Sequence, residues 1–89
     1  MTQSEIIRKL RKELSEAFDD FKYNMNIYAI KGERMLYVKI TYYHEIYELN
    51  YHYVSKDYAL HINDYTVAIV RDAEEEVAIE HFINAIKNH

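Results

Sequence analysis

The 89-residue chain contains no cysteine, no proline and no tryptophan, and its only glycine is Gly32. Without cysteine it can form neither a disulfide nor a thiolate metal site, and it has no thiol nucleophile. One glycine and no proline leave no material for a flexible linker or a glycine-rich phosphate-binding loop. This length is enough for one hydrophobic core, so we expect a single domain over residues 1–89.

Long apolar runs are also missing. No stretch approaches the roughly 18 apolar residues that a membrane-spanning helix needs. The first residues, MTQSEIIRKLRKEL, have no uninterrupted apolar segment and no small-residue cleavage site, which is unlike a secretory signal. The composition therefore predicts a cytoplasmic protein that does not contact a membrane.

Charge is modest in total but uneven along the chain. The net charge is −4, with a net of +2 over residues 1–43 and −6 over residues 44–89. A strongly basic footprint, typical of nucleic-acid-binding proteins, is absent. The acidic second half either attracts a basic partner or serves as an ordinary solubilising surface.

Helical periodicity appears at both ends of the chain. Thr2 and Glu5 have the spacing of a capping box, and Asp72 with Glu75 repeats it. Apolar residues then recur at intervals of three and four. This pattern predicts helices over residues 3–22 and 73–87. The first apolar stripe is Ile7, Leu10, Leu14, Phe18 and Phe21, and the second is Ile79, Phe82, Ile83 and Ile86.

Between the helices, apolar and polar residues alternate with a period of two, which is typical of half-buried strands. We expect strands over residues 23–31, 34–43, 46–54, 57–62 and 65–70. A hairpin loop at Gly32-Glu33 would place Ala29 opposite Leu36, whereas a loop at Lys31-Gly32 would shift the register by two and keep every face. Further turns are expected at residues 44–45, 55–56 and 63–64.

These elements predict an α+β fold with two layers. An antiparallel meander of four to five strands forms one layer, and both helices pack on its apolar face. Most of the ten tyrosines alternate with polar residues on that helix-facing side or its rim, where they supply buried area. These tyrosines are at positions 23, 42, 47, 51, 53, 58 and 65, and Val67 and Ile69 are expected beside Tyr65.

The remaining tyrosines define a first candidate site on the opposite face of the sheet. The members of this exposed aromatic face are Tyr28, Tyr37, Lys39, Tyr43 and His52. Neighbouring aromatic rings with a lysine can stack the bases of a single-stranded nucleic acid. Tyrosine is equally typical of protein contact surfaces, and aromatic cross-strand pairs also stabilise a half-exposed sheet without binding anything.

Acidic residues define a second candidate site. They surround the start of the closing helix and could concentrate negative charge at one end of the fold: Asp64, Asp72, Glu74, Glu75, Glu76 and Glu80. Such a surface can imitate phosphates and attract a basic partner. The alternative is a solvated helix start whose acids complement the helix dipole.

Catalytic and metal-binding patterns are weak. The three serines lie outside any nucleophile elbow. No carboxylate falls on an apolar face where burial would raise its pKa for acid–base work. His52 and His61 on neighbouring strands could ligate zinc, but no HxH or HExxH spacing is present. We expect no enzymatic activity, no metal and no cofactor.

The order of helix, antiparallel strands, acidic turn and helix resembles small phage or mobile-element accessory proteins. More narrowly, the segment EEEVAIEHFINAIKNH resembles the acidic helix of a compact type II-A anti-CRISPR protein, an inhibitor of Cas9. The resemblance covers about a fifth of the chain and has no diagnostic motif. It implies a protein that acts by binding, often with an acidic surface in place of DNA, and without a cofactor.

We therefore expect a non-enzymatic protein-binding module that inhibits a basic, nucleic-acid-handling protein such as a CRISPR nuclease. Two alternatives remain open at this point. One is a single-stranded nucleic-acid-binding domain that uses the Tyr/His/Lys face, and the other is a structural homodimer that pairs open sheet faces or edge strands.

Overall fold

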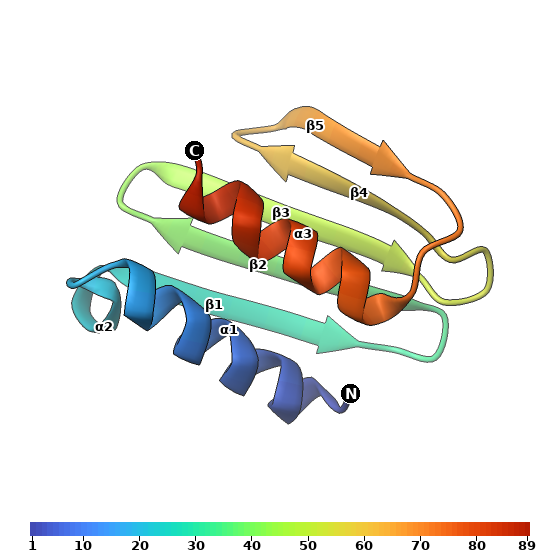
Figure 1. Ribbon diagram of the computed structural model, residues 1–89, viewed down its shortest axis with the longest axis horizontal. Coiled ribbons are helices and arrows are strands. Elements are labelled where there is room, and N and C mark those ends of the chain that lie inside the picture. Colours follow the sequence, from blue (N-terminus) through green and yellow to red (C-terminus); the bar gives the residue numbers. More distant parts are fainter.

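Two long helices lie side by side over one face of a five-stranded antiparallel sheet in the computed structural model, which describes residues 1–89 (Figure 1). The predicted two-layer α+β fold is confirmed. The strands follow one another in space in chain order, β1 to β5. The elements are α1 (Gln3–Ala17), α2 (Phe21–Asn24), β1 (Met25–Lys31), β2 (Met35–Tyr42), β3 (Glu45–His52), β4 (Asp57–Ile62), β5 (Tyr65–Val70) and α3 (Glu75–Lys87).

Helix α1 begins with the predicted capping box. The Glu5 backbone N–H donates to Thr2 Oγ1 at 3.1 Å, and the Thr2 N–H donates to Glu5 Oε1 at 2.8 Å. The helix is shorter than predicted, because the backbone of Phe18 is extended and the chain turns into the separate helix α2. Asp20 anchors this break by accepting hydrogen bonds from the hydroxyls of Tyr42 and Tyr43. These contacts join segments that are distant in the chain, so the local periodicity of the sequence could not predict the break.

The first two hairpins differ from the predicted registers. Ala29 opposes Val38, so the β1–β2 loop lies at residues 33–34, and Gly32 does not adopt a positive φ. The next turn begins at Tyr43, whose φ is 56°, and places Ile40 opposite Tyr47. Both registers are shifted by two residues from the expected pairing. A shift of two leaves each side chain on its face, so the predicted faces of β1 to β4 are correct.

The last strand has its predicted bounds, but a β-bulge changes the face on which its later residues lie. Tyr65 opposes Ile62, as the turn at Asn63-Asp64 requires, but one extra residue follows and places Ala68 opposite Leu60. The inward and outward positions exchange after the bulge. Ala68 and Val70 therefore pack toward the core, whereas Val67 and Ile69, which were expected there, are exposed.

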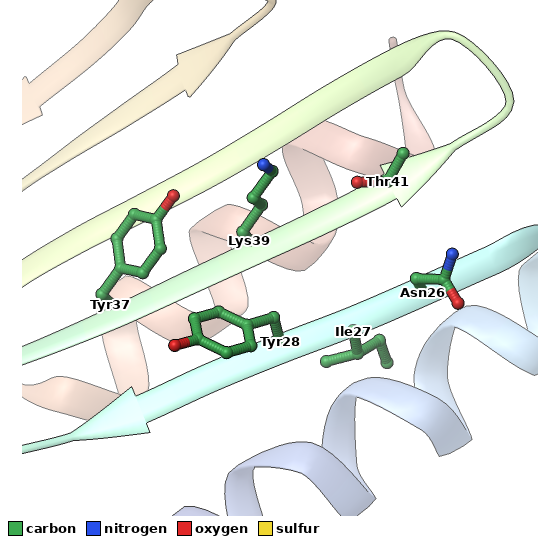
Figure 2. A pocket seen from close by; sticks show the side chains of 6 residues that line it. All are labelled: Asn26, Ile27, Tyr28, Tyr37, Lys39 and Thr41. Carbon is green, nitrogen blue, oxygen red and sulfur yellow. The ribbon is translucent and has the colours of Figure 1, made fainter.

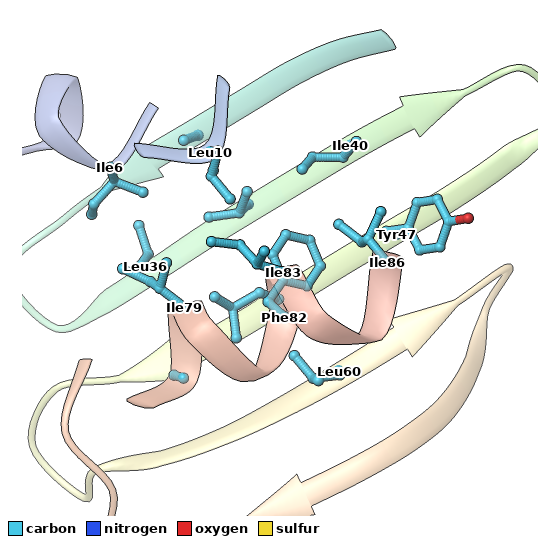
Figure 3. Close-up of a cluster of buried hydrophobic side chains, with 14 of the residues drawn as sticks. Ile6, Leu10, Leu36, Ile40, Tyr47, Leu60, Ile79, Phe82, Ile83 and Ile86 are labelled. Atoms are coloured by element: carbon cyan, nitrogen blue, oxygen red, sulfur yellow. The ribbon is translucent and has the colours of Figure 1, made fainter. Parts of the chain in front are cut away.

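The core lies between the helices and the central strands (Figure 3). Side chains of α1 and α3 meet those of β1 to β4, and no polar residue is buried among them. Ile6 takes the inward position of α1 that Ile7 was predicted to fill, and Ile7 is half-buried. The fully enclosed residues include Ile6, Leu10, Leu14, Leu36, Val38, Ile40, Leu49 and Ile83.

Tyrosines supply part of this core through both ring and hydroxyl. Tyr47, Tyr51 and Tyr58 are buried on the helix-facing side, as predicted, and Tyr42 and Tyr53 pack at its rim. The Tyr51 hydroxyl donates to the carbonyl of Ala73 at 2.7 Å, and the Tyr58 hydroxyl lies 2.7 Å from His81 Nδ1. His81 is therefore half-buried against the sheet.

Tyr23 and Tyr65 were also predicted on the helix-facing side or rim, and both are largely exposed. Tyr23 lies in α2 instead of a strand. Tyr65 begins β5, the outermost strand, which makes no extensive contact with either long helix. Position in the fold, and not the alternation of the sequence, decides the exposure of these two rings.

Helix α3 begins two residues later than predicted. Its N-cap is Glu74, which makes no capping hydrogen bond through its side chain. The expected cap of Asp72 with Glu75 is not formed, because Asp72 has a φ of 56° and the Glu75 carboxylate is held by other groups. The predicted apolar stripe of α3 is buried throughout. None of the helices has the length and apolar character that crossing a membrane requires.

Candidate functional site

The face of the sheet that turns away from the helices is uncovered. Across the strands its side chains form rows, of which the central one runs Tyr28, Lys39, Glu48, His61 and Thr66. The neighbouring row runs Ile30, Tyr37, Asn50, Ala59 and Ile69. Figure 2 shows part of this surface, which we call the open face, with α3 behind the sheet.

Tyr28 and Tyr37 form an aromatic pair at the centre of a shallow hollow on strands β1 and β2. Their ring centroids lie 6.3 Å apart at an interplanar angle of 67°. Lys39 opposes Tyr28 on the adjacent strand, and Asn26 and Thr41 complete the lining on this face (Figure 2). The prediction that Tyr28, Tyr37 and Lys39 lie together is met in this geometry.

A carboxylate lies beside this aromatic pair. The Tyr37 hydroxyl donates to Glu48 on β3. Burial, together with this hydrogen bond and the negative charge of Glu48, raises the pKa of Tyr37 to about 12. Tyr37 is therefore a neutral donor at physiological pH, and the open face carries a negative charge next to its aromatic rings.

The open face also has an aliphatic part, which was not among the predicted site residues. Tyr28 is 54% exposed, and Ile30, Met35 and Ile69 are exposed on the same side of the sheet. Ile30 could have been found, because it alternates in phase with Tyr28. Ile69 could not, since the bulge that turns it outward has no local signature in the sequence.

His52 and Tyr43 do not join this cluster. His52 lies on the open face at the end of β3, opposite Met35 and Asp57. Tyr43 lies in the turn at the other end of the β2–β3 hairpin, where its hydroxyl donates to Asp20. The structure thus brings together three of the five predicted residues and separates the other two toward opposite ends of the sheet.

Glu75, in the middle of the acidic candidate site, stabilises the fold through contacts within the chain. Its side chain is only 12% exposed and accepts hydrogen bonds from the N-terminal amine at 3.0 Å, from Lys31 Nζ at 3.1 Å and from the Tyr53 hydroxyl. Burial acts to raise the pKa of Glu75, but these three donors outweigh it and hold the pKa below its ordinary value. A partner cannot reach this carboxylate without displacing them.

Two more of the predicted acids are paired within the chain. Lys56 Nζ lies 2.8 Å from Glu74, and Lys9 Nζ lies 2.6 Å from Glu80. Lys9 belongs to α1 and Glu80 to α3, so this ion pair joins the two long helices. Asp72 and Glu76 are exposed and have no ion pair in the chain.

Asp64 lies away from the other acids. It belongs to the turn before β5, whereas Asp72 follows the end of that strand. A strand of six residues spans roughly 20 Å. The expected concentration of all six acids at one end of the fold is therefore wrong, because β5 separates the first of them from the rest.

The histidines do not form a metal site. His61 opposes Glu48 and lies 3.1 Å from the Thr66 hydroxyl through Nδ1, whereas His52 opposes Asp57 on the same strand pair. No group of three or more histidine or acidic side chains is arranged to hold a metal ion.

Comparison with known proteins assigns no family to this arrangement. No protein-family model matches the chain, and neither the curated proteins nor the solved structures include a significant match. The class that fold and surface define is a two-layer α+β domain with one uncovered sheet face.

Proposed function

We propose that the chain is a non-enzymatic protein-binding module whose contact surface is the open face. The observation that carries the proposal is the one-sided cover of the sheet: both long helices pack on the same side. Tyr28, Ile30, Met35 and Ile69 remain exposed on the other side. Exposed apolar side chains gathered on one surface and bordered by polar residues are typical of interaction sites, and tyrosine and methionine are enriched there.

We further propose that the partner is a basic, nucleic-acid-handling protein of phage or mobile-element conflict, such as a CRISPR nuclease. The net charge of −4 supports attraction to a basic partner. The exposed acids Asp72 and Glu76 add local negative charge near the start of α3. The resemblance to compact anti-CRISPR proteins supplies the class of the partner.

Single-stranded nucleic acid is the second candidate ligand, because Tyr28 and Tyr37 lie together beside Lys39. Stacking of bases on aromatic rings favours such binding. Glu48, which is bonded to Tyr37, opposes it by repelling phosphates. The electrostatic attraction that supplies most non-specific affinity is therefore weak on this surface.

Two double variants distinguish binding through the open face from binding through the acidic start of α3. The double variant Tyr28→Ser/Ile30→Ser removes apolar contacts from the open face, and Glu74→Lys/Glu76→Lys reverses charge at the start of α3. Glu75 stays intact because it holds the fold together. Val54→Ser, in the exposed β3–β4 loop, is the matched control.

The measurement is inhibition of DNA cleavage by purified Cas9, with Kd values for the same variants. We expect the open-face variant to weaken binding at least tenfold, as loss of central contacts does, and the control to bind as the wild type does. Equal binding by the open-face variant would contradict the proposed surface. Oligonucleotide binding in low-salt anisotropy measurements, without binding to Cas9, would favour the second candidate.

A further inference from the structure

The two edge strands of the sheet, β1 and β5, differ in their hydrogen bonds and packing. At the β1 edge the backbone N–H of Lys31 donates to Gln3 Oε1 of α1 at 2.9 Å, and α1 packs along this strand. At the β5 edge the backbone of Tyr65–Val70 makes no hydrogen bond outside its ladder with β4. Every second residue of such a strand turns its N–H and C=O away from its only neighbour.

Strand β5 also lacks the side chains that usually protect an edge. Natural edge strands carry charges or proline that prevent pairing with another chain. The segment YTVAIV has neither, and Tyr65, Val67 and Ile69 are exposed along it. No charged side chain and no proline within β5 therefore opposes a second strand beside it.

The bulge makes β5 symmetric about its centre. Thr66 and Ile69 both lie on the open face, opposite His61 and Ala59. Tyr65 and Val70 both lie on the helix-facing side, opposite Ile62 and Tyr58. In a regular strand, residues three or five positions apart face opposite sides. Because β5 contains one extra residue, these pairs lie on the same face instead. When a second copy of β5 runs antiparallel beside the first, residues on the same face therefore lie opposite each other.

We propose that two copies of this chain dimerise through β5, with the strands paired antiparallel about a two-fold axis so that one sheet continues into the other. Thr66 then faces the partner's Ile69, and Tyr65 faces the partner's Val70. In an isologous interface of this kind each contact occurs twice.

Charge at the two ends of β5 supports a second copy as the occupant. The same pairing places Asp64 opposite the partner's Arg71. Both side chains are exposed, and neither has an ion-pair partner in the chain. An unrelated strand would have to supply this arrangement of opposite charges, whereas a copy of the chain supplies it at both ends. The inference rests on the edge of the sheet and is independent of the function proposed for its open face.

The first test is sedimentation equilibrium over a concentration series. The wild type is expected to reach twice the chain mass of 10.8 kDa. Val67→Lys places a charge at the centre of the edge and should raise the dimer dissociation constant at least about tenfold. Val54→Lys adds the same charge at an exposed loop position and should leave that constant unchanged. A wild type that stays monomeric at hundreds of micromolar, or equal effects of the two lysines, would overturn the proposal.

A charge exchange tests the register. Arg71→Glu and Asp64→Lys each place like charges at both ends of the pair, so each variant alone should dimerise less tightly than the wild type. An equimolar mixture should form a heterodimer, because every end again brings opposite charges together. Lysine is chosen at position 64, where φ is 70°, because Lys56 already adopts a φ of 57°. A mixture that dimerises no better than its separate components contradicts this register.

Hydrogen exchange distinguishes the edge from the open face. The β5 amides that point away from β4 should become more protected as the wild-type concentration rises, and the same amides in Val67→Lys should not. A dimer in which these outward β5 amides remain unprotected would pair through another surface, and the proposal would be wrong.

Discussion

The two faces of the same strands experience opposite environments, although their residues alternate one by one. Leu49 is fully enclosed by the helices, whereas its neighbour Asn50 lies on the open face. Tyr51 is buried with its hydroxyl bonded to the backbone before α3, whereas Tyr28 on the open face is more than half exposed. The comparison shows that a residue type does not fix its role in this domain. What decides it is whether the helices cover the side chain: they bury the inward residues of the central strands, and the outward residues of the same strands stay open to solvent.

The largest expected effect is a cavity on the helix-facing side. Leu49→Ala should lower the free energy of unfolding by about 2 to 5 kcal/mol, because the helices cannot collapse fully into the space. Asn50→Ala, one residue further on the open face, should change it by less than about 0.5 kcal/mol. Urea unfolding monitored by circular dichroism measures both. Similar losses from the two variants would remove the distinction between the faces.

The second effect concerns Glu75, which ties the N-terminus, β1 and α3 together. Glu75→Gln should lower stability at pH 7 by about 1 to 3 kcal/mol, since buried donors lose a charged acceptor. The pKa of Glu75 is held below its ordinary value of 4.5, so its contribution is present above pH 4.5 and is lost as pH falls through the folded pKa.

The measurement for Glu75 is the free energy of unfolding as a function of pH. Wild type and Glu75→Gln should converge in acid, and Glu76→Gln, an exposed carboxylate one residue later, should follow the wild type throughout. A constant difference between wild type and Glu75→Gln down to pH 2 would show that the charge of Glu75 is not the cause.

A single hydroxyl should matter on one face and not on the other. Tyr51→Phe leaves the Ala73 carbonyl without its donor and should lower the unfolding free energy by about 1 kcal/mol. Tyr28→Phe removes an exposed hydroxyl for which no hydrogen bond is found in the chain, and should be neutral within about 0.5 kcal/mol. Thermal unfolding of the two variants in parallel provides the measurement. A larger loss of stability in Tyr28→Phe than in Tyr51→Phe would contradict the expected difference between the two faces.

The smallest effect tests the open face by spectroscopy. Ultraviolet absorbance of tyrosinate should show that Tyr37 ionises near pH 12, assigned by its loss in Tyr37→Phe. Glu48→Gln removes a negative charge and should lower the pKa of Tyr37, although burial still keeps it raised. An unchanged titration in Glu48→Gln would mean that the hydrogen bond to Glu48 does not form in solution.

Much of the open face could be predicted from alternation alone, because a period of two assigns each residue to a side whatever the exact pairing. Tyr28, Tyr37 and Lys39 were placed on this face even though both predicted hairpin registers were two residues in error. The acidic site was less predictable. Glu75 and Glu80 look like free surface acids in the sequence, but Lys31 and Lys9 reach them from distant segments.

The sequence by itself determined the type and order of the major elements, the capping box of α1, the buried stripe of α3 and the faces of four strands. These features depend on local hydrogen bonds and on periodicity, both of which are written in neighbouring residues. Only the tertiary structure decided the break after Ala17, the hairpin registers, the bulge that turns Ile69 outward and the burial of Glu75. Each of these depends on contacts between segments far apart in the chain, whose free energies outweigh the local preference of any one of them.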